Sequence, residues 1–185
     1  SLSTLQSVLV VGSNLRKDHP LFAQRIRQGA RHGCQVIALD SVERDWAIPI
    51  KHLLKHAASQ WVQALGGIAA AVAQEKGVAG PAGSFVNDDA ATAVARSLMA
   101  GERKAVLLGN AAAHHAQATQ LLALANWIGE HTGATVGYLT EAANTVGAQF
   151  VGAHPVKGGL NAAQMLSGGL KAVLLLNNEP VHASS

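Results

Sequence analysis

The sequence is poor in cysteine, in aromatic residues and in charge. Its single cysteine, Cys34, excludes an internal disulfide and leaves too few thiolates for an iron–sulfur cluster, which takes about four. The apolar runs are far shorter than the roughly 20 residues that a membrane-crossing helix needs, so we expect no direct membrane span. The net charge is only +3, and no basic run is interleaved with aromatic residues, so nucleic-acid binding is not expected.

Apolar residues make up 49% of the chain and gather in short runs. Five of these runs predict β-strands: Val8–Val11, Gln35–Leu39, Ala105–Leu108, Thr135–Leu139 and Ala172–Leu176. Most of them do not alternate with polar residues, which is typical of parallel strands buried on both faces. We therefore expect one α/β domain over residues 1–185. Its sheet should be open, doubly wound and mostly parallel, with about five strands and helices on both faces, as in Rossmann or flavodoxin-like folds.

Helical patterns lie between the predicted strands. They cover Pro20–His32, a stretch from Ser59 to Val72, a stretch from Asn87 to Ala100, one long helix from Ala111 to His131, and Leu160–Leu166. The glycine-rich segment 77–87 predicts a surface loop. The long two-helix connection after the second strand favours the strand order 2-1-3-4-5 over 3-2-1-4-5. The last predicted strand is followed by a turn and no helix, so we expect the chain to be a fragment of a longer protein.

The segment from Ser7 to Pro20 has the strand–turn–helix layout of a nucleotide cradle. A dinucleotide fingerprint needs three glycines at this turn, but only Gly12 is present, followed by Ser13, Asn14 and a leucine. The standard NAD fingerprint is therefore absent. Asp40 ends the second predicted strand, at the place of a ribose-binding acid.

Several other polar residues follow predicted strands, where α/β sheets bind ligands. The crevice candidates are Gly12, Ser13, Asn14, Asp40, Gly109, Asn110, Glu141, Asn144 and Asn178. We interpret this crevice as vestigial, and no nucleophile elbow or triad predicts a catalytic residue. His52 and His56 would share one face if this stretch were helical, but no third ligand accompanies them, so no metal site is predicted.

The order of these segments resembles the molybdopterin oxidoreductase family. Residues 11–20 read Val-Gly-Ser-Asn-x-x-x-x-His-Pro, and they precede an arginine-rich helix, a glycine and an apolar strand ending in Asp40. Formate dehydrogenases and nitrate reductases carry a similar Gly-x-Asn-Pro-x-x-x-His-Pro segment. Residues 175–180, Leu-Leu-Asn-Asn-Glu-Pro, resemble the second Gly-x-Asn-Pro turn of that family.

A closer resemblance is to the large iron–sulfur subunits of bacterial NADH:quinone oxidoreductases, the type I NADH dehydrogenases. It rests on residues 8–20, 139–147, 158–162 and 174–180. The resemblance implies a structural, non-catalytic domain whose parent passes electrons from NADH to quinone through iron–sulfur clusters outside this fragment. It implies the rest of the parent polypeptide and other respiratory-complex subunits as partners. The implied location is the cytoplasmic side of the inner membrane.

Three departures separate the chain from the cofactor-binding pattern of the wider family. Leu15 stands where Asn-Pro is usual, and residues 41–44, Ser-Val-Glu-Arg, replace Pro-Arg-x-Thr. Residues 52–56, His-Leu-Leu-Lys-His, replace a Pro-Gly-Thr-Asp turn that resembles a guanine-recognising turn, and they offer no carboxylate. We therefore expect no cofactor in this fragment and no molybdopterin.

Two alternatives stay open at this point. The first is a molybdopterin-guanine-dinucleotide-binding domain of a formate dehydrogenase-like oxidoreductase, in which Ser13, Asn14 and Asp40 contact the dinucleotide. The second is a free-standing nucleotide-binding module.

Overall fold

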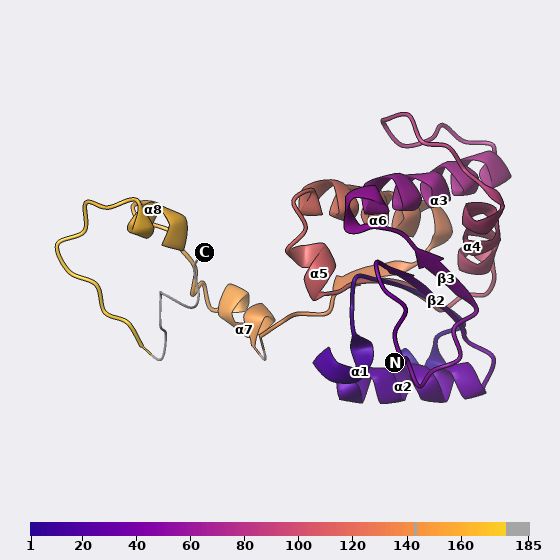
Figure 1. Ribbon diagram of the computed structural model, residues 1–185, viewed down its shortest axis with the longest axis horizontal. Helices are drawn as coiled ribbons and strands as arrows, with labels where there is room; N and C mark the ends of the chain where they lie inside the picture. The colour runs from indigo at the N-terminus through magenta and orange to yellow at the C-terminus, as the bar shows by residue number, and fades with distance from the viewer. Residues whose placement is uncertain (143, 177–185) are drawn as a thin grey trace. The chain divides into compact units, whose positions relative to one another are not determined.

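A computed structural model describes residues 1–142 and 144–176, and its contacts divide the chain into two units, Ser1–Glu141 and Ala142–Ser185 (Figure 1). The first unit holds a five-stranded sheet, made of β1 (Ser7–Val11), β2 (Gln35–Asp40), β3 (His52–Lys55), β4 (Lys104–Leu108) and β5 (Thr135–Tyr138). All neighbouring strands are parallel, in the order β3-β2-β1-β4-β5. The predicted α/β class with an open, doubly wound parallel sheet is confirmed.

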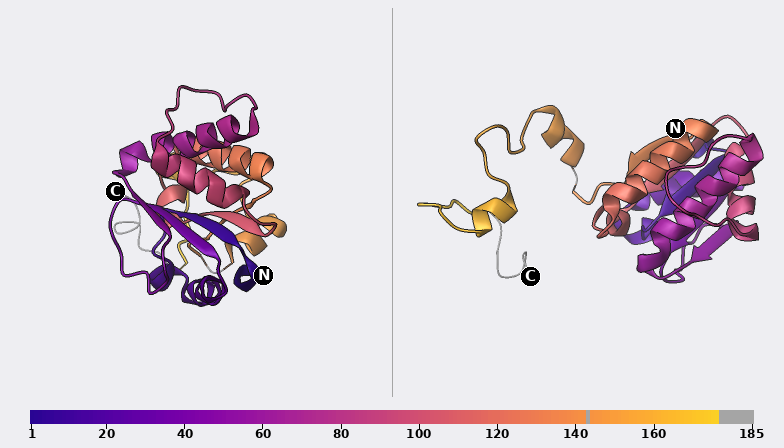
Figure 2. Two further views of the ribbon diagram at one scale, coloured as in Figure 1. Left: turned by 90° about the vertical axis from the view of Figure 1, so that its right-hand side faces the viewer. Right: turned by 90° about the horizontal axis from the view of Figure 1, so that it is seen from above.

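Helices cover the sheet on both faces (Figure 2). The helical elements of the first unit are η1 (Leu2–Thr4), α1 (Leu15–Asp18), α2 (Pro20–Arg31), η2 (Ala58–Gln60), α3 (Trp61–Lys76), α4 (Asp89–Met99), α5 (Asn110–Ala113) and α6 (Ala118–Thr132). Alternate residues of β1 point into two separate cores. Leu9 and Val11 pack with α3, α4 and α6, whereas Val8 and Val10 pack with α1 and α2. Burial on both faces explains why β1 reads as an unbroken apolar run.

The strand predicted at Ala172–Leu176 is wrong. These residues form no strand, and Leu174 is 94% exposed, so no described residue of the second unit covers it. The fifth strand is His52–Lys55 instead, which pairs with the outer side of β2 from Ile37 to Asp40. Numbered along the chain, the five strands lie in the order 3-2-1-4-5, so the expected order 2-1-3-4-5 is wrong. The four correctly predicted strands keep their expected order relative to one another, because the extra strand β3 pairs at the outer edge of β2.

The helices differ from expectation at two places. His52 lies in β3, so it and His56 do not share a face, which they would have done only in a helix. The helix expected from Ala111 to His131 is broken between α5 and α6. At the break, the His115 Nδ1 atom accepts a hydrogen bond from the Gln117 backbone N–H at 3.0 Å. A side chain that captures a backbone donor in this way competes with the helical hydrogen bond, which accounts for the break.

Among the described residues of the second unit are two short helices, α7 (Thr145–Phe150) and α8 (Ala162–Leu166). Asn161 and Gln164 form a capping box at the start of α8, with two reciprocal hydrogen bonds of 2.9 Å. Within residues 1–142 and 144–176, no helix combines the length and the hydropathy that crossing a bilayer demands. Whether the two units form one domain, as expected, stays a prediction.

Candidate functional site

The candidate residues of the expected crevice cluster after β1 and β4, at whose carboxyl ends the strand order changes direction along the chain. In sheets of this kind, ligands bind at such a switch point. The turns after the two strands are tied together by hydrogen bonds. The Gly109 N–H donates to the Val11 carbonyl at 2.8 Å, and the Ala111 N–H donates to the Gly12 carbonyl at 3.0 Å. The structure therefore brings the turns that contain Gly12 and Gly109 together.

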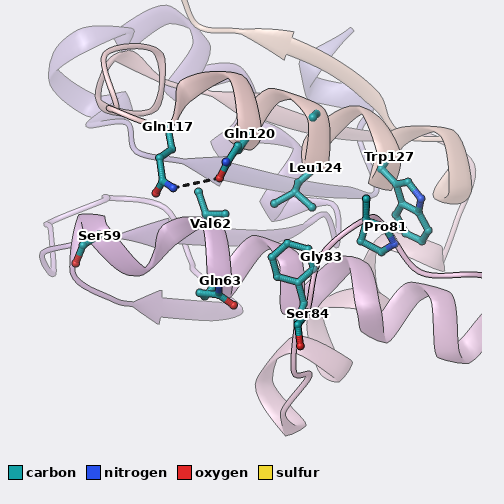
Figure 3. Close-up of a pocket in the computed structure, with 13 residues that line it drawn as sticks. Ser59, Val62, Gln63, Pro81, Gly83, Ser84, Gln117, Gln120, Leu124 and Trp127 are labelled. Atoms are coloured by element: carbon teal, nitrogen blue, oxygen red, sulfur yellow. Dashed lines mark hydrogen bonds between the residues drawn. The ribbon is translucent and has the colours of Figure 1, made fainter.

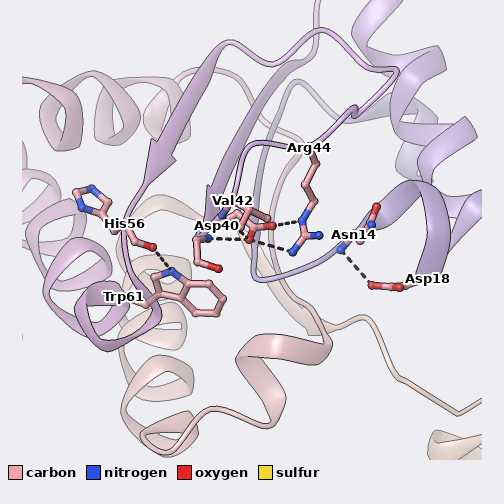
Figure 4. A network of polar contacts seen from close by, with 8 residues as sticks. Asn14, Asp18, Asp40, Val42, Arg44, His56 and Trp61 are labelled. Atoms are coloured by element: carbon pink, nitrogen blue, oxygen red, sulfur yellow. Dashed lines mark hydrogen bonds and ion pairs between the residues drawn. The ribbon is translucent and has the colours of Figure 1, made fainter.

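Trp61 fills the space above Gly12. Gly12 has a left-handed backbone with φ 60°, and a Cβ atom there would lie 2.6 Å from the Trp61 ring. The indole is 1% exposed, and its Nε1 donates to the His56 carbonyl at 3.1 Å (Figure 4). His115 stacks on the same ring, with 5.8 Å between centroids. The sequence placed Trp61 only on the apolar face of a helix, so its role in the crevice was missed.

The Arg44 guanidinium forms an ion pair with the carboxylate of Asp40. Asp40 is 1% exposed, and it accepts hydrogen bonds from Arg44 Nε at 2.6 Å and Arg44 NH2 at 3.2 Å (Figure 4). The backbone N–H groups of Ser41 and Val42 donate to Oδ1 at 2.7 and 3.4 Å. The hydrogen bond to Asp40 raises the pKa of the Arg44 guanidinium. Four hydrogen-bond donors already contact this carboxylate, so Asp40, which stands at the place of a ribose-binding acid, is part of a folded turn.

Two oxygen atoms at the crevice have no partner within the part of the chain that the structure describes. Ser13 is 2% exposed, and its buried Oγ makes no hydrogen bond there; the buried Oδ1 atom of Asn110 is in the same condition. The Ser13 side chain lies against Gly109, where an added Cβ would overlap it. Buried polar atoms without partners are uncommon, and they mark places where a ligand or a water molecule could supply a hydrogen bond. Asn14 is tied locally, since its backbone N–H donates to Asp18 Oδ2 at 3.1 Å.

Three candidate site residues remain: Glu141, Asn144 and Asn178. Glu141 Oε2 lies 2.7 Å from His114 Nε2, and both side chains are 68% exposed. Asn144 belongs to the second unit, where it precedes α7 without a side-chain cap. Asn178 lies outside the described residues.

Cys34 is buried, and burial raises the pKa of its thiol to about 11. The protonated thiol is a poor nucleophile and a poor metal ligand at neutral pH. Across the two described ranges, no three histidine, cysteine, aspartate or glutamate side chains come close enough to hold a metal ion. The one thiol of this chain is therefore not an activated nucleophile.

Two features that a dinucleotide site usually offers are taken up here by the chain's own side chains. A pyrophosphate needs close access to the backbone of the turn after β1, and a ribose or base needs a free acceptor. Trp61 covers Gly12, and Arg44 with two backbone N–H groups saturates Asp40. The unpartnered Ser13 and Asn110 oxygens are the features that a ligand could still satisfy.

Comparison with known proteins gave one family assignment. The model of a family described as "Molybdopterin oxidoreductase" matches residues 3–185, nearly the whole chain. No curated protein matches the sequence.

Proposed function

Because the chain belongs to the molybdopterin oxidoreductase family, we propose that it is a structural, non-catalytic domain of a respiratory NADH:quinone oxidoreductase subunit. In this proposal, the parent protein passes electrons from NADH to quinone through iron–sulfur clusters held outside these 185 residues. The domain packs against the rest of its parent polypeptide and against other subunits of the complex. The complex works on the cytoplasmic side of the inner membrane.

The observation that carries this proposal is the closure of the crevice by the chain's own side chains. The Trp61 indole is 1% exposed above Gly12, and Arg44 makes a two-pronged contact with Asp40. Both groups stabilise the fold at the place where a cofactor-binding relative would present free backbone and a free acceptor. This packing supports the proposal of a structural, non-catalytic domain.

A second candidate is a molybdopterin-guanine-dinucleotide-binding domain of a formate dehydrogenase-like oxidoreductase. The unpartnered oxygens of Ser13 and Asn110 favour it, because a ligand that donates hydrogen bonds would satisfy both. This candidate requires the Trp61 indole to move away from Gly12.

Calorimetric titration with GDP and with molybdopterin guanine dinucleotide separates the two candidates. We expect no binding heat at micromolar concentrations for the protein or for its Ser13→Ala variant. Micromolar binding that is lost in Ser13→Ala would overturn the structural proposal and support the second candidate. The variant keeps the turn intact, because the Ser13 hydroxyl makes no hydrogen bond to a described residue that folding would lose.

The respiratory assignment has its own test. Membranes of the source cells, solubilised mildly and separated on a native gel, should show this chain in the band that oxidises NADH. An antibody against the chain provides the readout, and an in-gel NADH stain locates the complex. Migration of the chain apart from every NADH-oxidising band would overturn the respiratory part of the proposal.

A further inference from the structure

A second hollow lies between α3, α6 and the loop that follows α3 (Figure 3). Its volume is about 580 Å³, within the range of roughly 300–1,000 Å³ typical of small-molecule sites. Its lining residues are distinct from those of the crevice at the strand ends. It is therefore a separate place on the molecule, and the proposed function gives it no role.

The lining combines an apolar floor with uncharged polar groups. Val62 and Leu124 form the floor and are 7% and 6% exposed, and the aromatic rings of Phe85 and Trp127 also line the hollow. Three glutamines and two serines supply the polar groups: Gln63, Gln117, Gln120, Ser59 and Ser84. Among the described residues, no aspartate, glutamate, lysine, arginine or histidine lines the hollow. A charged ligand would lose hydration there without gaining a partner of opposite charge.

The loop beside the hollow is fixed near both ends. The Val78 N–H donates to the Ala73 carbonyl at 3.0 Å, and Asn87 Nδ2 donates to Gln74 Oε1 at 2.7 Å. The Phe85 ring lies directly on Gly66, where any Cβ would overlap it. These contacts preform the wall of the hollow, which lowers the entropic cost of binding.

Two glutamines near the start of α6 present a matched donor and acceptor. Gln117 Nε2 donates to Gln120 Oε1 at 3.2 Å, as the dashed line in Figure 3 shows. This bond orients both carboxamides, and each carboxamide has further hydrogen-bonding capacity, through the Gln117 carbonyl oxygen and the Gln120 amide N–H groups. A ligand carboxamide offers the complementary N–H and C=O groups.

We propose that this hollow binds a small uncharged molecule that joins an aromatic ring to a carboxamide. The ring packs on Val62, Leu124 and the aromatic wall, and the carboxamide bonds the Gln117–Gln120 pair. This binding needs neither the crevice nor any partner subunit, so it can hold or fail independently of the proposed function.

Three probes of nearly equal shape test the charge and the hydrogen bonding together: benzamide, benzoate and benzamidinium. Titration of ¹⁵N-labelled protein should shift the Trp127 indole N–H with benzamide, with a dissociation constant of order 1 mM, typical of a fragment of about ten heavy atoms. Benzoate and benzamidinium should bind at least about 10-fold more weakly because their charges are not compensated. Similar affinities for all three probes, or shifts that avoid the hollow, would overturn the proposal.

Adding one negative charge to the hollow gives the second test. Gln120 is exposed, so Gln120→Glu should fold normally and place one carboxylate at the hollow. Benzamide should then bind about 10-fold more weakly, because the carboxylate lacks the N–H groups that Gln120 offers. Benzamidinium should bind more tightly, because the new negative charge favours a cation. Gln28→Glu, at an exposed glutamine on α2, is the matched control and should change neither affinity. If the two variants behave alike, the proposed site is wrong; Gln63→Glu repeats the test from α3.

Discussion

Replacing Arg44 with alanine tests whether the closed crevice stabilises the fold. The guanidinium contacts Asp40 through two nitrogens, at 2.6 and 3.2 Å, and Asp40 is 1% exposed. Truncation would leave a buried carboxylate served only by the backbone N–H groups of Ser41 and Val42. The missing partner cannot be replaced fully by water, because the carboxylate stays inside the turn.

The size of the effect follows from this geometry. Removing one partner of a buried ion pair costs about 3–5 kcal/mol. Arg44 itself is 28% exposed, and two backbone donors remain on Asp40, so we expect a loss near the lower end, about 3 kcal/mol. Arg44→Lys restores one charged contact but not the two-pronged geometry, so its loss should be intermediate.

Urea unfolding followed by circular dichroism measures the free energy of unfolding, and an unchanged m-value would show that the unfolding transition is comparable. Arg16→Ala is the control, since the ion pair of Arg16 with Asp45 has side chains 54% and 77% exposed. Its loss should be about 0–1 kcal/mol. If Arg44→Ala costs no more than Arg16→Ala, then Arg44 does not neutralise a buried charge, and the structural interpretation of the crevice is refuted.

Three further predictions concern Gly12, Asp88 and Cys34. Gly12→Ala should lower the free energy of unfolding in urea by more than about 2 kcal/mol, because the new Cβ would overlap the Trp61 ring and the backbone φ is positive. Gly33→Ala is the control: its φ is 92° but the space around it is open, so the loss should be about 1 kcal/mol. Asp88→Ala should lower the free energy of unfolding by about 1 kcal/mol, because it removes the side chain that caps α4 through a 2.7 Å hydrogen bond from the Ala91 N–H. Asp88→Asn should keep most of this capping stabilisation. Native Cys34 should react with iodoacetamide about 100-fold more slowly at pH 8 than the urea-unfolded thiol, given its pKa of about 11 against 9.0. Because the folded state then keeps a proton that the unfolded state loses, this thiol should lower stability as pH rises from 9 to 11; a rate equal to that of the unfolded thiol would contradict its burial.

The central strands could be predicted because their burial is visible in the sequence. β1 and β4 are covered on both faces, so they read as continuous apolar runs. β3 was missed because this edge strand has four residues and polar ends, His52 and Lys55, with only Leu54 buried. The apolar run at Ala172–Leu176 has the composition of a buried strand, but composition alone does not supply a pairing partner.

The sequence places the turns after β1 and β4 at one edge of the sheet, but it does not predict the side chains that pack against them. Gly12 and Gly109 were expected together because both follow strands, and the topology of a parallel sheet brings such positions to one edge. The contact of Trp61 with Gly12 joins residues far apart in the chain, and no local sequence pattern predicts it. The Asp40–Arg44 pair did leave a signal, since a basic residue four positions after an acid at a strand end is a natural counter-ion.

The indole above Gly12 also bears on the order of events in biosynthesis. A domain whose crevice a cofactor must fill gains stability only when that ligand is present, by an amount that depends on its concentration. Here Trp61, the first residue of α3, packs on Gly12 as soon as α3 docks on the sheet. Under the proposed function, maturation of this domain should not depend on cofactor supply, and starving cells of molybdenum should leave its abundance unchanged.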